Sequence, residues 1–199
     1  MVSESEPIAA SERARPRIGA IVLVLGLAVG ILALDQLAKW LVVSNLEEGV
    51  RVDVIGWFFG LTFVRNPGAA FSLGVGATWI FALIAVAVAV FIIVFARRIK
   101  SLAWATVFGM LLGGTLGNLA DRLLREPGFG RGAVIDFFQI WGLPFIFNVA
   151  DVAITFSVVL LVILTIAGIG LDGRRSRGRL ASDAAPSDVV RSDATDGDA

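Results

Sequence analysis

Three aspartates lie within one short stretch of the chain, residues 113–151, which connects two long apolar segments. They are Asp121, Asp136 and Asp151. A carboxylate at a membrane boundary is costly and usually has a function. Two carboxyl groups that share a site cannot both ionise easily, so one keeps its proton near neutral pH. The charged group can then activate water while the protonated group polarises a scissile carbonyl, which is the chemistry of an aspartic protease.

A repeated Asn-x-Ala-Asp pattern places an amide and a carboxylate at the ends of both apolar segments. Asn118 and Asp121 end the first segment, whereas Asn148 and Asp151 begin the second. Residues i and i+3 share one face of a helix, so each segment can present both groups to the same point. Position alone makes Asp151 one member of an acid pair. The spacing does not decide whether its partner is Asp121 or Asp136.

Both halves of this pattern also have a structural interpretation. Asn148 is a suitable N-cap for the second helix, and Asp151 would then lie near the positive end of the helix dipole. Arg122 lies four residues after Asn118 and could pair with Asp121, which would tie the helix end to the following loop. Capping and catalysis are compatible, so the structural interpretation does not exclude the chemical one.

Asp136 has apolar and aromatic neighbours in the segment 134–138. Such surroundings disfavour the charged form of a carboxyl group and raise its pKa. The structural alternative is a cap or turn residue in a re-entrant segment.

Asp35 and Lys39 lie in the outer part of the first apolar segment of the chain. Their i,i+4 spacing predicts an ion pair that lowers the cost of both charges in a membrane. Lys39 could instead extend to the outer headgroups. A serine–lysine dyad with Ser44 or Ser72 as nucleophile is chemically conceivable, but neither serine is flanked by a motif that supports it.

The composition excludes several kinds of chemistry. The chain has no cysteine and no histidine, which excludes disulfides, cysteine nucleophiles, histidine bases and metal sites built from either residue. We expect no metal and no cofactor. The arginines and tryptophans show no interleaved basic and aromatic surface, so we expect no nucleic-acid partner.

Four apolar segments predict a membrane protein. The chain is 57% hydrophobic, with a mean hydropathy of +0.84, and only 17% of its residues are charged, against roughly a quarter in soluble domains. Each segment is about as long as a membrane crossing requires. Glycines 113, 114 and 117 predict close packing of the third segment against its neighbours. The expected spans are residues 18–43, 77–96, 102–120 and 150–171.

The first loop carries signals for a small extracytoplasmic platform. Residues 50–54 and 57–64 are rich in β-branched and aromatic residues and predict short strands. Residues 69–73 predict a short interfacial helix with Phe71 at headgroup level. The expected fold is therefore an all-α membrane protein, with four transmembrane helices and a small β-containing platform.

Basic residues predict the orientation of the spans. In a four-span arrangement they gather on one side, which the positive-inside rule makes cytoplasmic. Both termini would then be cytoplasmic, and loops 44–76 and 121–149 would face outward. Residues 1–17 and 172–199 predict disordered tails that flank one domain, residues 18–171. The basic residues are Arg13, Arg15, Arg17, Arg97, Arg98, Lys100, Arg174, Arg175, Arg177 and Arg179.

Five motifs in order across residues 35–154 together resemble the bacterial lipoprotein signal peptidases, or signal peptidase II. The motifs are Asp35-Gln-Leu-Ala-Lys39, Arg65-Asn-Pro-Gly-Ala-Ala-Phe-Ser72, Gly113-Gly-Thr-Leu-Gly-Asn-Leu-Ala-Asp-Arg122, Val134-Ile-Asp-Phe137 and Phe147-Asn-Val-Ala-Asp-Val-Ala-Ile154. Each motif alone is weak, but their order and the four expected spans make the resemblance specific.

The resemblance implies an aspartic endopeptidase of the bacterial cytoplasmic membrane. Such enzymes remove signal peptides from prolipoproteins by cleaving before a cysteine that carries diacylglycerol. Lipidated prolipoproteins and membrane lipids would be the partners of a monomer whose active site lies at the outer leaflet. The implied catalytic pair is Asp136 and Asp151.

The resemblance also implies roles for seven further residues. Asn118, Arg122 and Asn148 would orient the pair and the substrate, and Asn66 would contact the substrate from the outer loop. Asp35 and Lys39 would support the site from the first span. Asp121 would be structural, and it remains the rival catalytic residue.

Two other classes of function remain as alternatives. A small four-span transporter would use intramembrane acids as proton or ion sites, and it predicts carboxylates near the bilayer midplane together with inverted-repeat halves. A non-catalytic membrane scaffold would leave the acids without a role.

Overall fold

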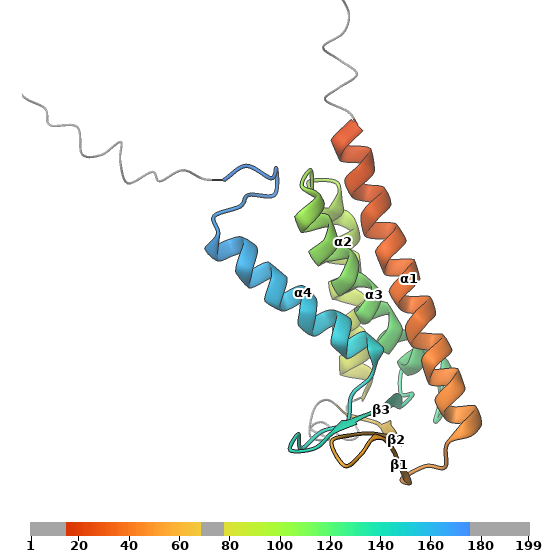
Figure 1. Ribbon diagram of the computed structural model, residues 1–199. Helices are drawn as coiled ribbons and strands as arrows, with labels where there is room; N and C mark the ends of the chain where they lie inside the picture. The colour runs from red at the N-terminus through yellow and green to blue at the C-terminus, as the bar shows by residue number, and fades with distance from the viewer. Residues whose placement is uncertain (1–14, 69–77, 176–199) are drawn as a thin grey trace, which may run out of the picture.

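The computed structural model describes residues 15–68 and 78–175, which form four long helices and one small sheet (Figure 1). The four helices are long and apolar enough to cross a membrane, which confirms the expected fold class. The expected interfacial helix at residues 69–73, with Phe71, lies outside the described residues. In order, the elements are α1 (Arg15–Asn45), β1 (Arg51–Ile55), β2 (Phe59–Asn66), α2 (Thr78–Ala96), α3 (Leu102–Leu124), β3 (Val134–Ile140) and α4 (Val149–Ile166).

Helix α3 lies at the centre of the bundle. In its most apolar window 61% of the residues are buried inside the protein, against 17–22% for the other three helices. Glycines on α3 permit this packing. A Cβ atom at Gly113 would lie 2.9 Å from the carbonyl oxygen of Ala28 on α1, and one at Gly114 would lie 2.5 Å from that of Ala150 on α4. The predicted close approach at these glycines is confirmed.

We expect Gly114→Ala to lower the free energy of unfolding by about 1–3 kcal/mol, because the added methyl group forces α4 away from α3. Gly30→Ala on α1 is the matched control. A Cβ atom there meets nothing within 4 Å, and alanine is the better helix former by about 1 kcal/mol. Thermal unfolding of both purified variants in one detergent checks this. Equal melting temperatures would contradict the close-packing account.

The fourth helix ends earlier than expected. It stops at Ile166, and Gly168 follows in the left-handed conformation with φ of 66°, a common way to end a helix. The chain then turns back, and the carbonyl oxygen of Leu171 accepts hydrogen bonds from the backbone N–H groups of Lys100 and Ser101, both at 3.0 Å. The turn thereby supplies an acceptor for free donors at the start of α3, and residues 172–175 belong to the described part of the chain.

The sheet lies at one end of the bundle, opposite the beginning of α1 and the end of α4 (Figure 1). Its strands run antiparallel in the order β1-β2-β3. The two predicted strands are confirmed as β1 and β2, which a turn at Gly56 separates with φ of 48°. Strand β3 was not predicted. It pairs with β2 and places Asp136 opposite Val64.

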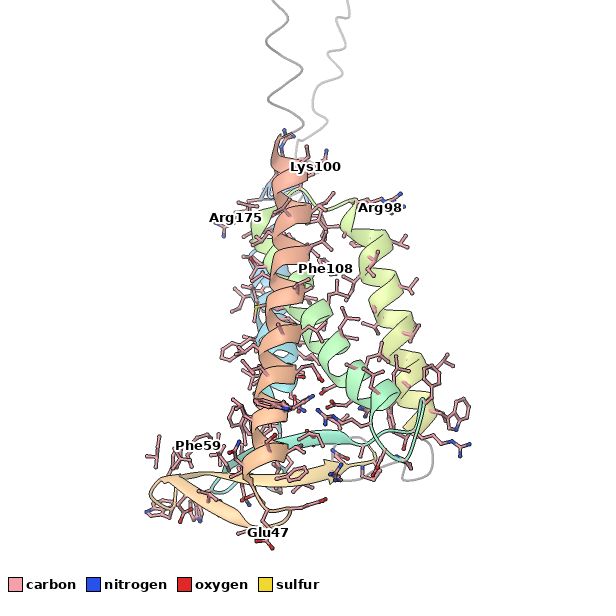
Figure 2. All side chains as sticks on the ribbon, turned by 90° about the vertical axis from the view of Figure 1, so that its right-hand side faces the viewer. Glu47, Phe59, Arg98, Lys100, Phe108 and Arg175 are labelled. Atoms are coloured by element: carbon pink, nitrogen blue, oxygen red, sulfur yellow. The ribbon has the colours of Figure 1, made fainter. Side chains whose placement is uncertain are left out.

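The two ends of the molecule differ in charge. Figure 2 shows Glu47 and Phe59 at the sheet end and Arg98, Lys100 and Arg175 at the other end of the helices. All three basic side chains are exposed. The sheet end and the basic end are thus separated by the length of the apolar helices.

Candidate active site

Asp136 is the central acid of the site, and β3 holds it against the ends of two other elements. Its side chain is only 4% exposed. Asn66, at the end of β2, donates a hydrogen bond to Asp136 Oδ2 at 2.9 Å. Asn148, just before α4, donates one to Asp136 Oδ1 at 2.6 Å. Both carboxyl oxygens are therefore fixed by amide groups.

Asp151 is held by the cap of α4. Asn148 is the N-cap, and its Oδ1 accepts the backbone N–H of Asp151 at 3.0 Å, while its own N–H donates to Asp151 Oδ2 at 3.2 Å. This reciprocal capping box satisfies two donors at the helix start. The predicted N-cap is confirmed. The same residue binds Asp136 through its side chain, so Asn148 contacts both acids.

Asn118 on α3 is the third asparagine, after Asn66 and Asn148, whose side chain contacts the acids. Its Nδ2 donates to Asp151 Oδ1 at 2.8 Å. Its Oδ1 accepts hydrogen bonds from Asn148 Nδ2 at 3.1 Å and from Lys39 Nζ at 3.0 Å. Helix α3 is thereby connected to α1 and α4 at one point.

Lys39 and two aspartates form a buried charge cluster next to Asn118. Lys39 Nζ lies 2.8 Å from Asp35 Oδ2 and 2.7 Å from Asp121 Oδ2, and the three side chains are fully buried. The predicted Asp35–Lys39 pair is confirmed. Asp35 Oδ1 also accepts the backbone N–H of Ala150 at 2.9 Å, which ties α1 to the start of α4. Lys39 therefore faces inward and does not extend toward headgroups.

Two members of this cluster were missed by the sequence analysis. Gln36 donates hydrogen bonds to the backbone oxygen of Gly117 and to Asp121 Oδ1, at 3.1 and 3.3 Å. Arg125 Nε lies 2.5 Å from the same oxygen of Asp121. The expected partner of Asp121 was Arg122, which is wrong: the residue one turn further along α3 takes that place. The i,i+4 spacing of Asp121 and Arg125 was the available signal.

Arg122 points instead toward the acids. Its Nη2 donates to the backbone oxygen of Gly68 at 2.9 Å, and its guanidinium carbon lies 5.6 Å from the centre of the Phe81 ring. Its Nε is buried and has no hydrogen-bond partner among the described residues. A cationic side chain with a free donor thus lies beside two carboxyl groups.

A cavity of about 620 Å³ opens onto the two acids. Both Asp136 and Asp151 line it, together with amide groups, Arg122 and the apolar segment of residues 143–147. Among the described residues, neither Asp121 nor Lys39 lines this cavity. The lining residues are Val64, Arg65, Asn66, Gly68, Asn118, Arg122, Val134, Asp136, Gln139, Leu143, Pro144, Phe145, Ile146, Phe147 and Asp151.

Burial raises the pKa of Asp136 from 3.8 to about 6, and the negative charge of Asp151 adds to the rise. The hydrogen bonds from Asn66 and Asn148 and the positive charge of Lys39 oppose it. The expected direction of the shift is confirmed, whereas the structural alternative, a cap or turn residue in a re-entrant segment, is wrong. Asp136 belongs to a strand whose N–H and C=O groups are paired with β2.

The nine predicted site residues all lie at the sheet end of the helices. Eight form one continuous hydrogen-bonded network, and Arg122 lines the same cavity as the two acids. The conceivable serine–lysine dyad finds no support here. Ser44 is exposed, Ser72 lies outside the described residues, and Lys39 is paired with two carboxylates.

Comparison with known proteins places this geometry in a family. The model of the family described as Signal peptidase (SPase) II matches residues 27–167, a range that contains all nine site residues. The chain belongs to the signal peptidase II family. It is thus a protease, a hydrolase, and a multi-pass protein of the cytoplasmic membrane. The transporter alternative has no support, because the relatives named below are peptidases of this family.

Curated relatives agree with the family match. The lipoprotein signal peptidase of Leifsonia xyli subsp. xyli is 56% identical over 180 residues, which cover 89% of this chain and 83% of the relative. That of Rhodococcus jostii is 46% identical over 145 residues, 73% of each chain. That of Mycobacterium tuberculosis strain H37Rv is 46% identical over 155 residues, 77% of this chain and 76% of the relative.

Solved structures share the fold. Two bacterial membrane enzymes, determined by the in meso method at 2.3 and 1.9 Å, superpose with TM-scores of 0.66 and 0.63. The first is 26% identical and covers 86% of this chain and 95% of its own. The second is 29% identical and covers 75% and 94%, respectively. The overall fold is therefore shared with both of these membrane enzymes.

Proposed function

We propose that this chain is an aspartic endopeptidase that removes signal peptides from prolipoproteins, with Asp136 and Asp151 as its catalytic pair. Cleavage occurs before the diacylglyceryl-modified cysteine. The observation that carries the assignment of the pair is the double contact of Asn148, which donates to Asp136 through its side chain and to Asp151 through its backbone. One residue thus fixes both acids at the wall of the same cavity.

The two acids take different roles because their surroundings differ. Asp136, with its raised pKa, is the member of the pair that carries a proton in the productive form of the enzyme, and it donates this proton to the oxygen of the scissile carbonyl. Asp151 removes a proton from the attacking water, and the remaining hydroxyl group bonds to the carbonyl carbon. In the second step Asp151 passes its proton to the departing amide nitrogen, and Asp136 recovers its own. The C–N bond breaks, and the pair regains its starting protonation.

Asp121 fits a structural role better than a catalytic one. Both of its oxygens are occupied by cations, Lys39 on one side and Arg125 on the other. The backbone N–H of Ile135 also donates to it at 3.2 Å, which anchors the start of β3. An acid so neutralised, and away from the cavity, has no free oxygen for water. The rival pairing of Asp121 with Asp151 is therefore disfavoured.

The remaining cavity residues match a lipidated peptide substrate. Arg122 adds a positive charge to the lining of the cavity, and Asn66 lines it next to Asp136. The apolar segment 143–147 offers a surface for the apolar residues of a signal peptide. Substrate binding thus combines polar groups beside the acids with an apolar part of the same cavity.

The orientation in the membrane follows from the charge distribution. The exposed basic residues Arg98, Lys100 and Arg175 lie at the end opposite the sheet (Figure 2), and the positive-inside rule makes that end cytoplasmic. Both termini are then cytoplasmic, and the acids lie at the outer leaflet. A signal peptide that spans the membrane would present its cleavage site at this level.

Purified protein in lipid vesicles tests the proposed function with two synthetic peptides. Both carry the same signal sequence, and only one carries diacylglycerol on its cysteine. We expect mass spectrometry to show cleavage of the lipidated peptide alone, at the bond before the modified cysteine. Cleavage of neither peptide, or of both at equal rates, would contradict the proposed substrate class.

The raised pKa of Asp136 predicts an acidic activity optimum. Because Asp136 must hold a proton, the productive fraction of enzyme decreases as the pH rises through about 6, and kcat/KM, which reports the free enzyme, should show an alkaline limb there. Asn66→Ala removes a hydrogen bond that stabilises the charged form, so the limb should move to higher pH.

The matched control for this shift is Gln139→Ala. Gln139 also lines the cavity, but it accepts its hydrogen bond from Thr62 at 2.6 Å. We expect the alkaline limb of Gln139→Ala to coincide with that of the unmodified enzyme. A limb that stays in place in Asn66→Ala as well would show that Asp136 does not set it.

A further inference from the structure

The buried ammonium group of Lys39 makes one contact that its charge does not require. The carboxylates of Asp35 and Asp121, at 2.8 and 2.7 Å, already neutralise it. Its third hydrogen bond goes to the neutral amide oxygen of Asn118 at 3.0 Å. An ammonium has three N–H donors and no acceptor, so these three bonds use all of its donors.

This third bond, together with the one from Asn148 Nδ2 to the same oxygen, favours the orientation in which the amide of Asn118 is found. An ammonium can only donate, so the oxygen of the amide must face Lys39. The NH₂ group is then directed at Asp151 Oδ1, 2.8 Å away. In the flipped orientation the NH₂ group would face the ammonium and the oxygen would face the carboxylate of Asp151. Both contacts of the flipped amide would be repulsive.

We propose that Lys39 is a positioning residue for catalysis, which fixes the amide of Asn118 and through it the carboxylate of Asp151. The inference rests on the proposed function and deepens it. The direction of donation runs from Lys39 to Asn118 Oδ1 and from Asn118 Nδ2 to Asp151. The same oxygen of Asn118 accepts Nδ2 of Asn148, which also donates to Asp136. Lys39 and Asn148 thus hold the amide oxygen of Asn118 together, and Lys39 is the charged member of the two.

The position of Lys39 predicts which kinetic constant it affects. It does not line the cavity among the described residues, so its loss removes no group that contacts the substrate directly. If the carboxylate of Asp151 is misplaced, the chemical step slows, because a displacement of a catalytic group on the order of 1 Å can cost about 10²-fold in rate. The effect should therefore appear in kcat and leave KM nearly unchanged.

The test compares two variants that both lack the charge of Asp35. Asp35→Asn keeps Lys39, whereas Asp35→Asn/Lys39→Met removes one negative and one positive charge together, so no unpaired charge is buried. Cleavage of the lipidated peptide is measured for each. We expect kcat of the double variant to be about 10- to 100-fold below that of Asp35→Asn, with similar KM values.

A second background distinguishes positioning from a general loss of packing. In Asn118→Ala the amide that transmits the effect is absent, so adding Lys39→Met to Asp35→Asn/Asn118→Ala should not lower kcat further. Contacting residues that act as a unit show this non-additivity. Asp35→Asn/Lys39→Leu, which also lacks a donor, undergoes the same two comparisons, and it decides the case if the methionine variant does not fold.

The outcomes separate this inference from the proposed function. Equal kcat values with and without Lys39, or the same loss in both Asn118 backgrounds, would overturn the positioning role while the unmodified enzyme still cleaves. Failure of the unmodified enzyme to cleave the lipidated peptide would overturn the proposed function itself. A loss in kcat that disappears in the Asn118→Ala background would support the inference.

Discussion

Asp136→Asn and Asp151→Asn should each reduce cleavage of a lipidated prolipoprotein peptide by about 10⁴-fold or more, a loss typical for members of a catalytic unit. An amide at position 136 has no acidic proton to donate to the substrate carbonyl, and an amide at 151 cannot remove a proton from water. The fold should persist, because asparagine has nearly the same shape as aspartate and still accepts a hydrogen bond in the cap of α4. Initial rates in lipid vesicles, together with thermal unfolding, measure both effects.

Asp53→Asn is the control for these variants. Asp53 lies on β1 and is 61% exposed, where it pairs with Arg51 at 2.7 Å. Exposed pairs contribute about 0–1 kcal/mol, so neither activity nor stability should change appreciably. Near-normal cleavage by Asp136→Asn or by Asp151→Asn would remove that residue from the catalytic pair.

Asp121→Asn should behave in the opposite way, with a large loss of stability and residual turnover. The substitution leaves Lys39 and Arg125 without the carboxylate that bridges them. Removal of one partner from a buried pair costs about 3–5 kcal/mol. Since Asp121 is away from the cavity, enzyme that remains folded should still cleave, much faster than either dyad variant does.

Thermal unfolding and single-turnover cleavage of the same Asp121→Asn preparation check this prediction. The measured rate is referred to the folded fraction, so that a loss of protein is not mistaken for a loss of chemistry. A variant as stable as the unmodified enzyme but without turnover would favour Asp121 as the partner of Asp151.

The helical part of the fold was predictable because it depends on local patterns. Spans of about 20 apolar residues predict transmembrane helices, and all four are present within one or two turns of the expected ends. The end of α4 was misplaced, because Gly168 and the contact of Leu171 with the start of α3 are invisible in a hydropathy pattern. A long-range hydrogen bond, not local composition, determines where this chain turns.

Strand β3 and the place of Asp136 could not be derived in the same way. The segment 134–140 is apolar and aromatic around the aspartate, which fits a strand and a membrane re-entrant segment equally well. It pairs with β2, which lies far away in the chain: Asn66 on β2 and Asp136 on β3 are 70 residues apart. Only the structure shows that Asn66 and Asp136 meet, and that Asn66 and Asn148 each donate a hydrogen bond to one oxygen of Asp136.

The capping and ion-pair contacts could be predicted from the sequence only where both residues belong to one helix end. The i,i+4 pair of Asp35 and Lys39 and the N-cap at Asn148 both follow from local spacing and are present. The sequence could not show that Asp121 would join the first pair from another helix, or that Asn118 would connect it to the acids. Local spacing predicts contacts within one helix, whereas the site is assembled between helices.

The central claim is that Asp136 is the member of the pair that holds the catalytic proton, and infrared difference spectroscopy tests it most directly. The enzyme in lipid vesicles is titrated across the pH range on both sides of 6, and the C=O stretch of a protonated carboxyl group is followed. The account predicts a carboxylic-acid band that is lost with a midpoint near pH 6 and is absent from Asp136→Asn. A band that persists unchanged in Asp136→Asn would contradict it.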